Sequence, residues 1–125
     1  MNKEKRIIGI DPGFDRCGVA ILEKIEGKER LLYSTCITTS IKDVHEKRLN
    51  KLGTELREII NEWKPKSLAI EKLFFNVNQK TGLKVAEARG VIMYEASLKN
   101  LSVTEYSPQA IKIAVTGYGK ATKPQ

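Results

Sequence analysis

The chain has 125 residues, with 22 Lys and Arg against 15 Asp and Glu, which gives a formal net charge of +7 and a pI near 9.5. This length predicts one domain, residues 1–125, which is large enough to bury a core. The basic charge favours a nucleic-acid partner, and the alternative is a merely soluble basic protein.

Several classes of protein are disfavoured at once. No stretch is long and apolar enough to span a membrane. The charged segment Met1–Arg6 precedes an apolar run that Asp11 and Pro12 interrupt, so we do not expect a signal peptide. Cys17 and Cys36 follow no metal-ligand spacing, and we expect both as reduced strand residues in a cytoplasmic protein.

The first predicted elements are three short strands, Arg6–Ile10, Gly18–Lys24 and Leu31–Thr38. Their apolar and β-branched residues are typical of strands. The polar segment Glu26–Glu29 predicts a hairpin turn between the second strand and the third. The three strands are therefore expected to form an antiparallel meander.

A helix over Lys42–Trp63 is predicted next. Its apolar residues recur every three or four positions, which is the period of one helix face. These residues are Leu49, Leu52, Leu56, Ile59, Ile60 and Trp63. Pro65 ends the helix, and a strand over Ser67–Ile70 follows directly.

The last part of the chain alternates helices and a strand. A loop over Asn76–Gly82 leads into a helix over Thr81–Lys99, followed by a strand over Ser102–Tyr106. A third helix is predicted over Pro108–Val115, since proline suits a first helical turn, and Thr116–Gln125 reads as a tail. The order βββαβαβα predicts an α/β protein with a mixed five-stranded sheet flanked by helices.

Two predicted strands each end in one acid. Asp11 follows the run Ile7–Ile10, and Glu71 follows Ser67–Ile70. If the two strands are neighbours, both carboxylates reach the same sheet edge and supply the oxygen ligands that Mg²⁺ prefers. The alternatives are that Asp11 forms an ordinary Asp-Pro-Gly turn and that Glu71 is a solvated strand end.

The segments around these acids resemble the RuvC family of Holliday-junction resolvases. The resemblance rests on Gly-Ile-Asp-Pro-Gly at Asp11, Ala-Ile-Glu-Lys-Leu-Phe-Phe at Glu71 and Ala-Glu-Ala-Arg-Gly-Val over residues 86–91. Residues 105–112 and Thr-Gly-Tyr-Gly over residues 116–119 fit the same family. The matches keep their order over nearly the whole chain.

The resemblance implies an RNase H-like fold, a homodimer and Mg²⁺-dependent cutting of four-way DNA junctions, with two metal ions in the complete site. It makes Asp11 and Glu71 the catalytic metal ligands. Phe74 matches an aromatic residue that stacks on bases, and Lys112 and Lys123 match basic residues that contact DNA. Branch-migration helicase subunits are possible partners on the same grounds.

Other candidates come from the residues themselves. Basic side chains that could line a phosphate channel are Lys80, Lys84, Lys112, Lys120 and Lys123. Arg89 either faces DNA or pairs with Glu87 or Glu95. Gly82, Ala86 and Gly90 recur every four residues and let another backbone approach, either the sheet or a second subunit. Residues near that stripe, with Met93 among them, form the expected dimer interface.

The family's two further acidic positions lie on a helix beyond the point where this sequence ends. We therefore expect a truncated or shortened chain that binds branched DNA and cuts it negligibly. Two rival functions follow: an inactive junction-binding module of the same fold, and, less favoured, a fragment of an actin-like ATPase. The second rival needs a two-domain fold that 125 residues do not hold.

Overall fold

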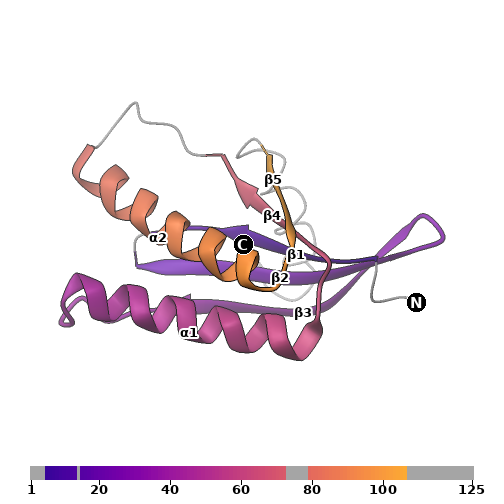
Figure 1. Ribbon diagram of the computed structural model, residues 1–125, viewed down its shortest axis with the longest axis horizontal. Coiled ribbons are helices and arrows are strands. Elements are labelled where there is room, and N and C mark those ends of the chain that lie inside the picture. Colours follow the sequence, from indigo (N-terminus) through magenta and orange to yellow (C-terminus); the bar gives the residue numbers. More distant parts are fainter. Residues whose placement is uncertain (1–4, 14, 73–78, 107–125) are drawn as a thin grey trace, which may run out of the picture.

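The computed structural model describes residues 5–13, 15–72 and 79–106, which form a sheet with two helices on one face (Figure 1). The strands are β1 (Arg6–Asp11), β2 (Arg16–Ile25), β3 (Lys28–Thr38), β4 (Ser67–Glu71) and β5 (Ser102–Tyr106), and the helices are α1 (His45–Trp63) and α2 (Gln79–Leu98). The five strands lie in the order β3-β2-β1-β4-β5. β1 to β3 are antiparallel neighbours, whereas β4 runs parallel to both β1 and β5. The predicted mixed sheet is confirmed.

The core lies between this sheet and the two helices. Ile8 and Ile10 of β1 and Leu68 and Ile70 of β4 have no exposed surface. The helices contribute Leu52, Leu56, Ile59 and Ile60 from α1 and Ala88, Ile92 and Ala96 from α2. Because side chains alternate along a strand, every second residue of β1 and β4 faces away from the helices. Asp11 and Glu71 belong to that second set.

Helix α1 begins three residues later than predicted, at His45 instead of Lys42. Ser40 forms a turn there, because its carbonyl accepts the Asp43 N–H at 3.1 Å and its hydroxyl accepts the Lys42 N–H at 3.1 Å. Helix α1 ends at Lys64 in the left-handed conformation, whose N–H donates to the Ile60 carbonyl at 2.8 Å. The buried Pro65 follows this cap as predicted.

The β2–β3 hairpin is longer than predicted and its turn is shorter. Only Glu26 and Gly27 form the turn, with φ values of 53° and 80°. A two-residue turn with both φ values positive matches the right-handed twist of the strands, and glycine adopts it without strain. Lys28 and Glu29, which were assigned to the turn, belong to β3.

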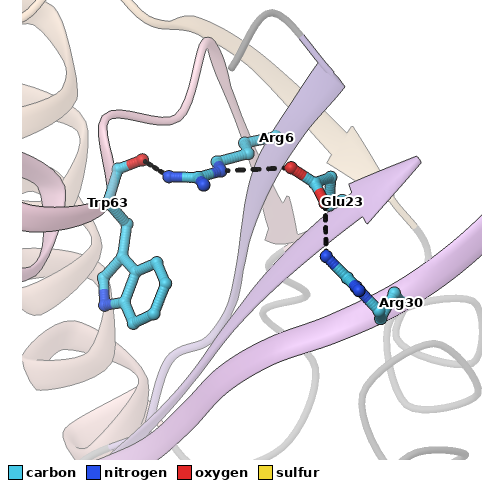
Figure 2. A network of polar contacts seen from close by, with 4 residues as sticks. All are labelled: Arg6, Glu23, Arg30 and Trp63. Atoms are coloured by element: carbon cyan, nitrogen blue, oxygen red, sulfur yellow. Dashed lines mark hydrogen bonds and ion pairs between the residues drawn. The ribbon is translucent and has the colours of Figure 1, made fainter. Parts of the chain in front are cut away.

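An ion-pair network around the buried Glu23 holds the sheet end that carries the start of β1 (Figure 2). Glu23 of β2 is only 4% exposed and contacts two guanidinium groups, Arg6 Nε at 3.5 Å and Arg30 Nη2 at 3.1 Å. Arg6 also donates through Nη1 to the Trp63 carbonyl at 2.7 Å, at the end of α1. The Trp63 ring stacks on Tyr33 of β3 with centroids 5.4 Å apart. One charged cluster thus ties β1, β2, β3 and α1 together.

Helix α2 begins at Gln79, two residues before the predicted start, and ends at Leu98. The predicted helix over Pro108–Val115 and the tail over Thr116–Gln125 lie outside the described residues. Neither α1 nor α2 is long and apolar enough to cross a lipid bilayer.

Candidate active site

Asp11 and Glu71 lie at the ends of two neighbouring parallel strands. Ile10 of β1 pairs with Ile70 of β4, so the next residue in each strand is one of the two acids. Both isoleucines face the helices, and the alternation of the strands therefore directs both acids to the opposite face. Neighbouring strands lie about 4.8 Å apart, close enough for two carboxylates to share one cation. The predicted adjacency of the two strands is confirmed.

The donor set fits a hard divalent cation. Both acids are partly buried, and carboxylate oxygens are the ligands that Mg²⁺ takes while it keeps several waters. Within residues 5–13, 15–72 and 79–106, no third His, Cys, Asp or Glu completes a metal-binding cluster with them. Asp11 and Glu71 are thus the two described residues that could hold the metal.

Two glycines shape the backbone around Asp11. A Cβ atom on Gly13 would lie 2.3 Å from the Arg16 carbonyl oxygen, so the turn after β1 requires glycine at this position. Gly18 pairs with Asp11 across β1 and β2, and a Cβ there would lie 3.6 Å from the Asp11 Cβ. A side chain at Gly18 would thus make only an ordinary van der Waals contact, whereas Gly13 is required by the turn.

A buried arginine supports this turn from the helix side. Arg48 of α1 is 8% exposed and donates through Nη2 to Asp15 Oδ1 at 2.5 Å and through Nε to Thr39 Oγ1 at 3.0 Å. The Thr39 N–H donates to the Asp15 carbonyl at 3.2 Å. The Asp15 carboxylate is therefore engaged by Arg48. No local sequence pattern marks Arg48, because its partners are distant in the chain.

The charge of Asp11 affects the core beneath it. Cys17 of β2 is buried among apolar side chains, and this burial, together with the negative charge of Asp11 and the nearby Cys36, raises the pKa of its thiol to about 12. Cys36 of β3 is exposed, and both cysteines are free. The two predicted half-buried thiols thus differ, since one is sealed in the core and the other faces solvent.

Arg89 of α2 contacts the end of β4. Its Nε donates to the backbone carbonyl of Glu71 at 3.4 Å, and its Nη2 forms an ion pair with Glu105 of β5. The two acids that the sequence offered as partners pair elsewhere. Glu87 contacts His45 Nε2 at 2.6 Å, and Glu95 receives two hydrogen bonds from Arg57 at 2.7 and 2.9 Å. The Arg89 guanidinium, 13% exposed, is thus used within the fold.

The remaining predicted DNA-contacting residues fall in two groups. Lys84 of α2 is half-buried and, with His45 and Arg48, lines a small cavity behind the turn after β1. Lys80 lies in the first turn of α2, where the structure describes only the backbone. The other four, Phe74, Lys112, Lys120 and Lys123, lie outside the described residues.

The predicted dimer residues lie on α2. Gly90 is exposed, and nothing lies within 4 Å of a Cβ atom built on it. Met93 is 37% exposed and Ala86 is half-buried. Apolar residues exposed on the same helix are Leu83 (63%), Tyr94 (59%) and Leu98 (50%). Ile92 and Ala96 of the same helix are fully buried in the core.

Known proteins with similar sequences share one description. Residues 7–125 match the family model described as crossover junction endodeoxyribonuclease RuvC. The protein of that name from Brachyspira hyodysenteriae is 44% identical over 116 residues, which are 93% of this chain and 72% of the relative. The protein of that name from Finegoldia magna is also 44% identical, over 96% of this chain and 73% of the relative.

Solved structures agree with the sequence comparison. The Thermus thermophilus RuvC structure superposes with a TM-score of 0.75 and 29% identity, covering 94% of this chain and 73% of that one. T. thermophilus RuvC in complex with a Holliday junction substrate gives a TM-score of 0.78 and 25% identity, over 89% of this chain and 69% of that one. The mixed sheet is thus the RNase H-like fold of these proteins. With a family match over nearly its whole length, the chain belongs to the RuvC family of crossover junction endodeoxyribonucleases.

Proposed function

We propose that this protein resolves four-way DNA junctions by Mg²⁺-dependent hydrolysis of phosphodiester bonds, with Asp11 and Glu71 as metal ligands. The endonuclease activity is that of its family. The observation that carries the site assignment is the pairing of Ile10 with Ile70, which brings the two acids to neighbouring strand ends. The relative solved with a Holliday junction substrate supports branched DNA as the substrate.

The chemistry needs carboxylates that converge on one point. A bound Mg²⁺ polarises the scissile phosphate and lowers the pKa of a bound water, and a pair of ions serves both ends of an in-line displacement. Asp11 and Glu71 would hold the cation at the sheet edge, where the paired backbones of β1 and β4 position the two carboxylates. Two ions are proposed for the complete site, with these two residues among their ligands.

Affinity for DNA is proposed to come from basic and aromatic side chains around this edge. The net charge of +7 favours phosphate binding, which would weaken steeply as salt rises. Residues proposed to contact DNA are Phe74, Lys80, Lys84, Lys112, Lys120 and Lys123. Phe74 follows Glu71 closely in the sequence, a suitable place for an aromatic that stacks on an unpaired base.

A homodimer through α2 is proposed because this helix leaves an apolar surface exposed. Gly90 offers a point of close backbone approach, with Met93, Leu83 and Tyr94 exposed on the same helix. A two-fold axis would bring the same patch of each subunit together and present two sites to two opposed strands. A cytoplasmic location fits two free cysteines, and helicase partners rest on the family resemblance.

Substituting the two acids tests the site. Asp11→Asn or Glu71→Gln should abolish nicking of a four-way junction while junction affinity changes less than threefold. Asp43→Asn and Glu58→Gln, at exposed positions before and within α1, are matched controls that should keep both. Loss of affinity and cleavage together would show that the two acids are structural.

A junction-binding module without cleavage is the second candidate, because the described residues bring together two acids and not three. It predicts salt-sensitive junction binding with no Mg²⁺-dependent product. If the unmodified chain nicks a junction and Asp11→Asn abolishes that nicking, the junction-binding module without cleavage is excluded.

A further inference from the structure

Arg89 joins the ends of two strands beneath the candidate metal site. It lies on α2 and is largely buried, with 13% of its side chain exposed. Its Nε donates to the Glu71 carbonyl at 3.4 Å, its Nη2 pairs with Glu105, and its Nη1 lies 3.6 Å from Met93 Sδ. One guanidinium therefore contacts the last residue of β4 and the next-to-last residue of β5.

The register of the sheet separates this contact from the metal-binding face. Ile70 pairs with Glu105, and Glu71 pairs with Tyr106. Ile70 and Glu105 lie toward α2, where Arg89 meets Glu105, whereas the next residue of each strand faces the other side. Arg89 thus holds the backbone of Glu71 from the helix face while the carboxylate belongs to the opposite face.

The end of β4 has particular need of such support. Its outer neighbour, β5, is the edge strand of the sheet, and all five of its residues are exposed. The Lys72 N–H donates to the Tyr106 carbonyl at 2.6 Å, which continues the ladder one step past Glu71. Strand ends at a sheet edge open easily because few packed side chains hold them. Arg89 connects this edge to α2, which is anchored in the core through Ala88 and Ile92.

We propose that Arg89, through its pair with Glu105, is a positioning residue that fixes Glu71 for metal binding without touching metal or DNA. The proposal rests on the proposed role of Glu71 as a ligand. Residues that orient a metal ligand typically contribute 10- to 100-fold to metal affinity. A planar guanidinium can serve the carbonyl and the carboxylate at once, whereas a lysine ammonium is a single point of charge.

Metal affinity without DNA tests the proposal. Mn²⁺ titration of the whole chain, followed by calorimetry or by the spin resonance of free Mn²⁺, should show about tenfold weaker binding for Arg89→Ala. Arg89→Lys and Glu105→Gln, which preserve more of the local packing, should each weaken it severalfold. Hydrogen exchange at the Lys72 amide should become faster in the same variants.

Arg57→Ala is the matched control. It breaks the arginine–glutamate pair between Arg57 of α1 and Glu95 of α2, neither of which is on β4 or β5. The proposal would be overturned if Arg89→Lys and Glu105→Gln bound Mn²⁺ as tightly as Arg57→Ala does. It would also be overturned if the Arg89 variants bound the junction more weakly with unchanged Mn²⁺ affinity, which would make Arg89 a DNA contact.

Glu71→Gln separates this inference from the proposed metal site on which it rests. If it leaves Mn²⁺ affinity intact, the proposed metal site and this inference both fail; if it weakens Mn²⁺ binding and the Arg89 variants do not, only this inference fails.

Discussion

The two ends of β1 differ in the partners of their carboxylates. At the start of β1, the buried Glu23 is held by the guanidinium groups of Arg6 and Arg30 (Figure 2). At the other end, Asp11 and Glu71 lie on neighbouring strands with like charges side by side. Two arginines on the helices near that end, Arg48 and Arg89, pair with the acids Asp15 and Glu105. The first end is arranged for stability. If Asp11 and Glu71 form the proposed metal site, the second end keeps two acids together at a cost that a bound dication would offset.

The largest expected effect concerns the two thiols near the Asp11 end. Because the pKa of Cys17 is raised from 9.0 to about 12, its thiolate fraction near pH 8 should be roughly a thousandfold below that of an ordinary thiol. A disulfide reagent should therefore label Cys36 rapidly and Cys17 only on unfolding. Rapid labelling of two thiols per folded chain would show that the sheet is open at this end.

The same shift predicts a loss of stability in alkali. Cys17 holds its proton more tightly when folded, so its contribution to the free energy of unfolding is complete below pH 9 and falls between pH 9 and 12. Urea unfolding of a Cys17→Ser variant should not show this fall in stability between pH 9 and 12, although the variant is less stable overall. An identical slope in both proteins above pH 9 would contradict the assignment.

Removing the buried carboxylate should give the next largest effect. Glu23→Ala removes the acceptor of both Arg6 and Arg30, and we expect a loss of about 2 kcal/mol in the free energy of unfolding, because the Arg30 side chain is 71% exposed and stays solvated. Glu58→Ala, at an exposed position of α1, is the control. Urea denaturation measures both. A loss below 1 kcal/mol would mean that this network is replaceable.

Asp11→Asn should raise the free energy of unfolding, whereas Glu23→Ala lowers it. Relieving the repulsion between two carboxylates is expected to stabilise the metal-free protein by about 1 kcal/mol. Thermal unfolding should also show that Mg²⁺ raises the midpoint of the unmodified protein and not that of the variant, since a ligand stabilises the state that binds it. A midpoint that rises equally in both proteins would place the cation elsewhere.

The smallest change in stability is expected for Trp63→Phe. Within the described part of the chain, its buried indole N–H has no hydrogen-bond partner, while its ring stacks on Tyr33 and lies 5.7 Å from the Arg6 guanidinium. Trp63→Phe keeps an aromatic ring and removes the unpaired donor, so the changes largely cancel and stability should shift by less than about 1 kcal/mol. Trp63→Ala, which removes the ring, is the contrasting variant and should cost about 3 kcal/mol.

The sequence predicted well what depends on local pattern. The apolar, β-branched run Ile7–Ile10 marked β1, and the helical period from Leu52 to Ile60 marked α1. The position of Asp11 and Glu71 at strand ends followed from the same pattern. The start of α1 was wrong because the Ser40 hydroxyl forms a local turn that apolar periodicity does not reveal.

What the sequence did not reveal depends on partners distant in the chain. Glu23, Arg48 and Arg89 look like ordinary surface charges in a linear reading, yet each is largely buried and paired across the fold. Their burial becomes evident only once strand register is known, since charged residues are rarely buried unless paired. Arg89 was accordingly offered as a DNA contact, although its guanidinium lies among Glu71, Glu105 and Met93.

The parallel pairing of β1 with β4 has a consequence for synthesis of the protein. β1, β2 and β3 form a meander from contiguous sequence, whereas β4 joins β1 only after β2, β3 and α1 have been made. Closing such a long loop costs entropy and makes this pairing a late step of folding. A nascent chain on the ribosome can therefore hold Asp11 in a folded hairpin while Glu71 is still missing. If Asp11 and Glu71 form the proposed metal site, that site is assembled only when most of the sheet is complete.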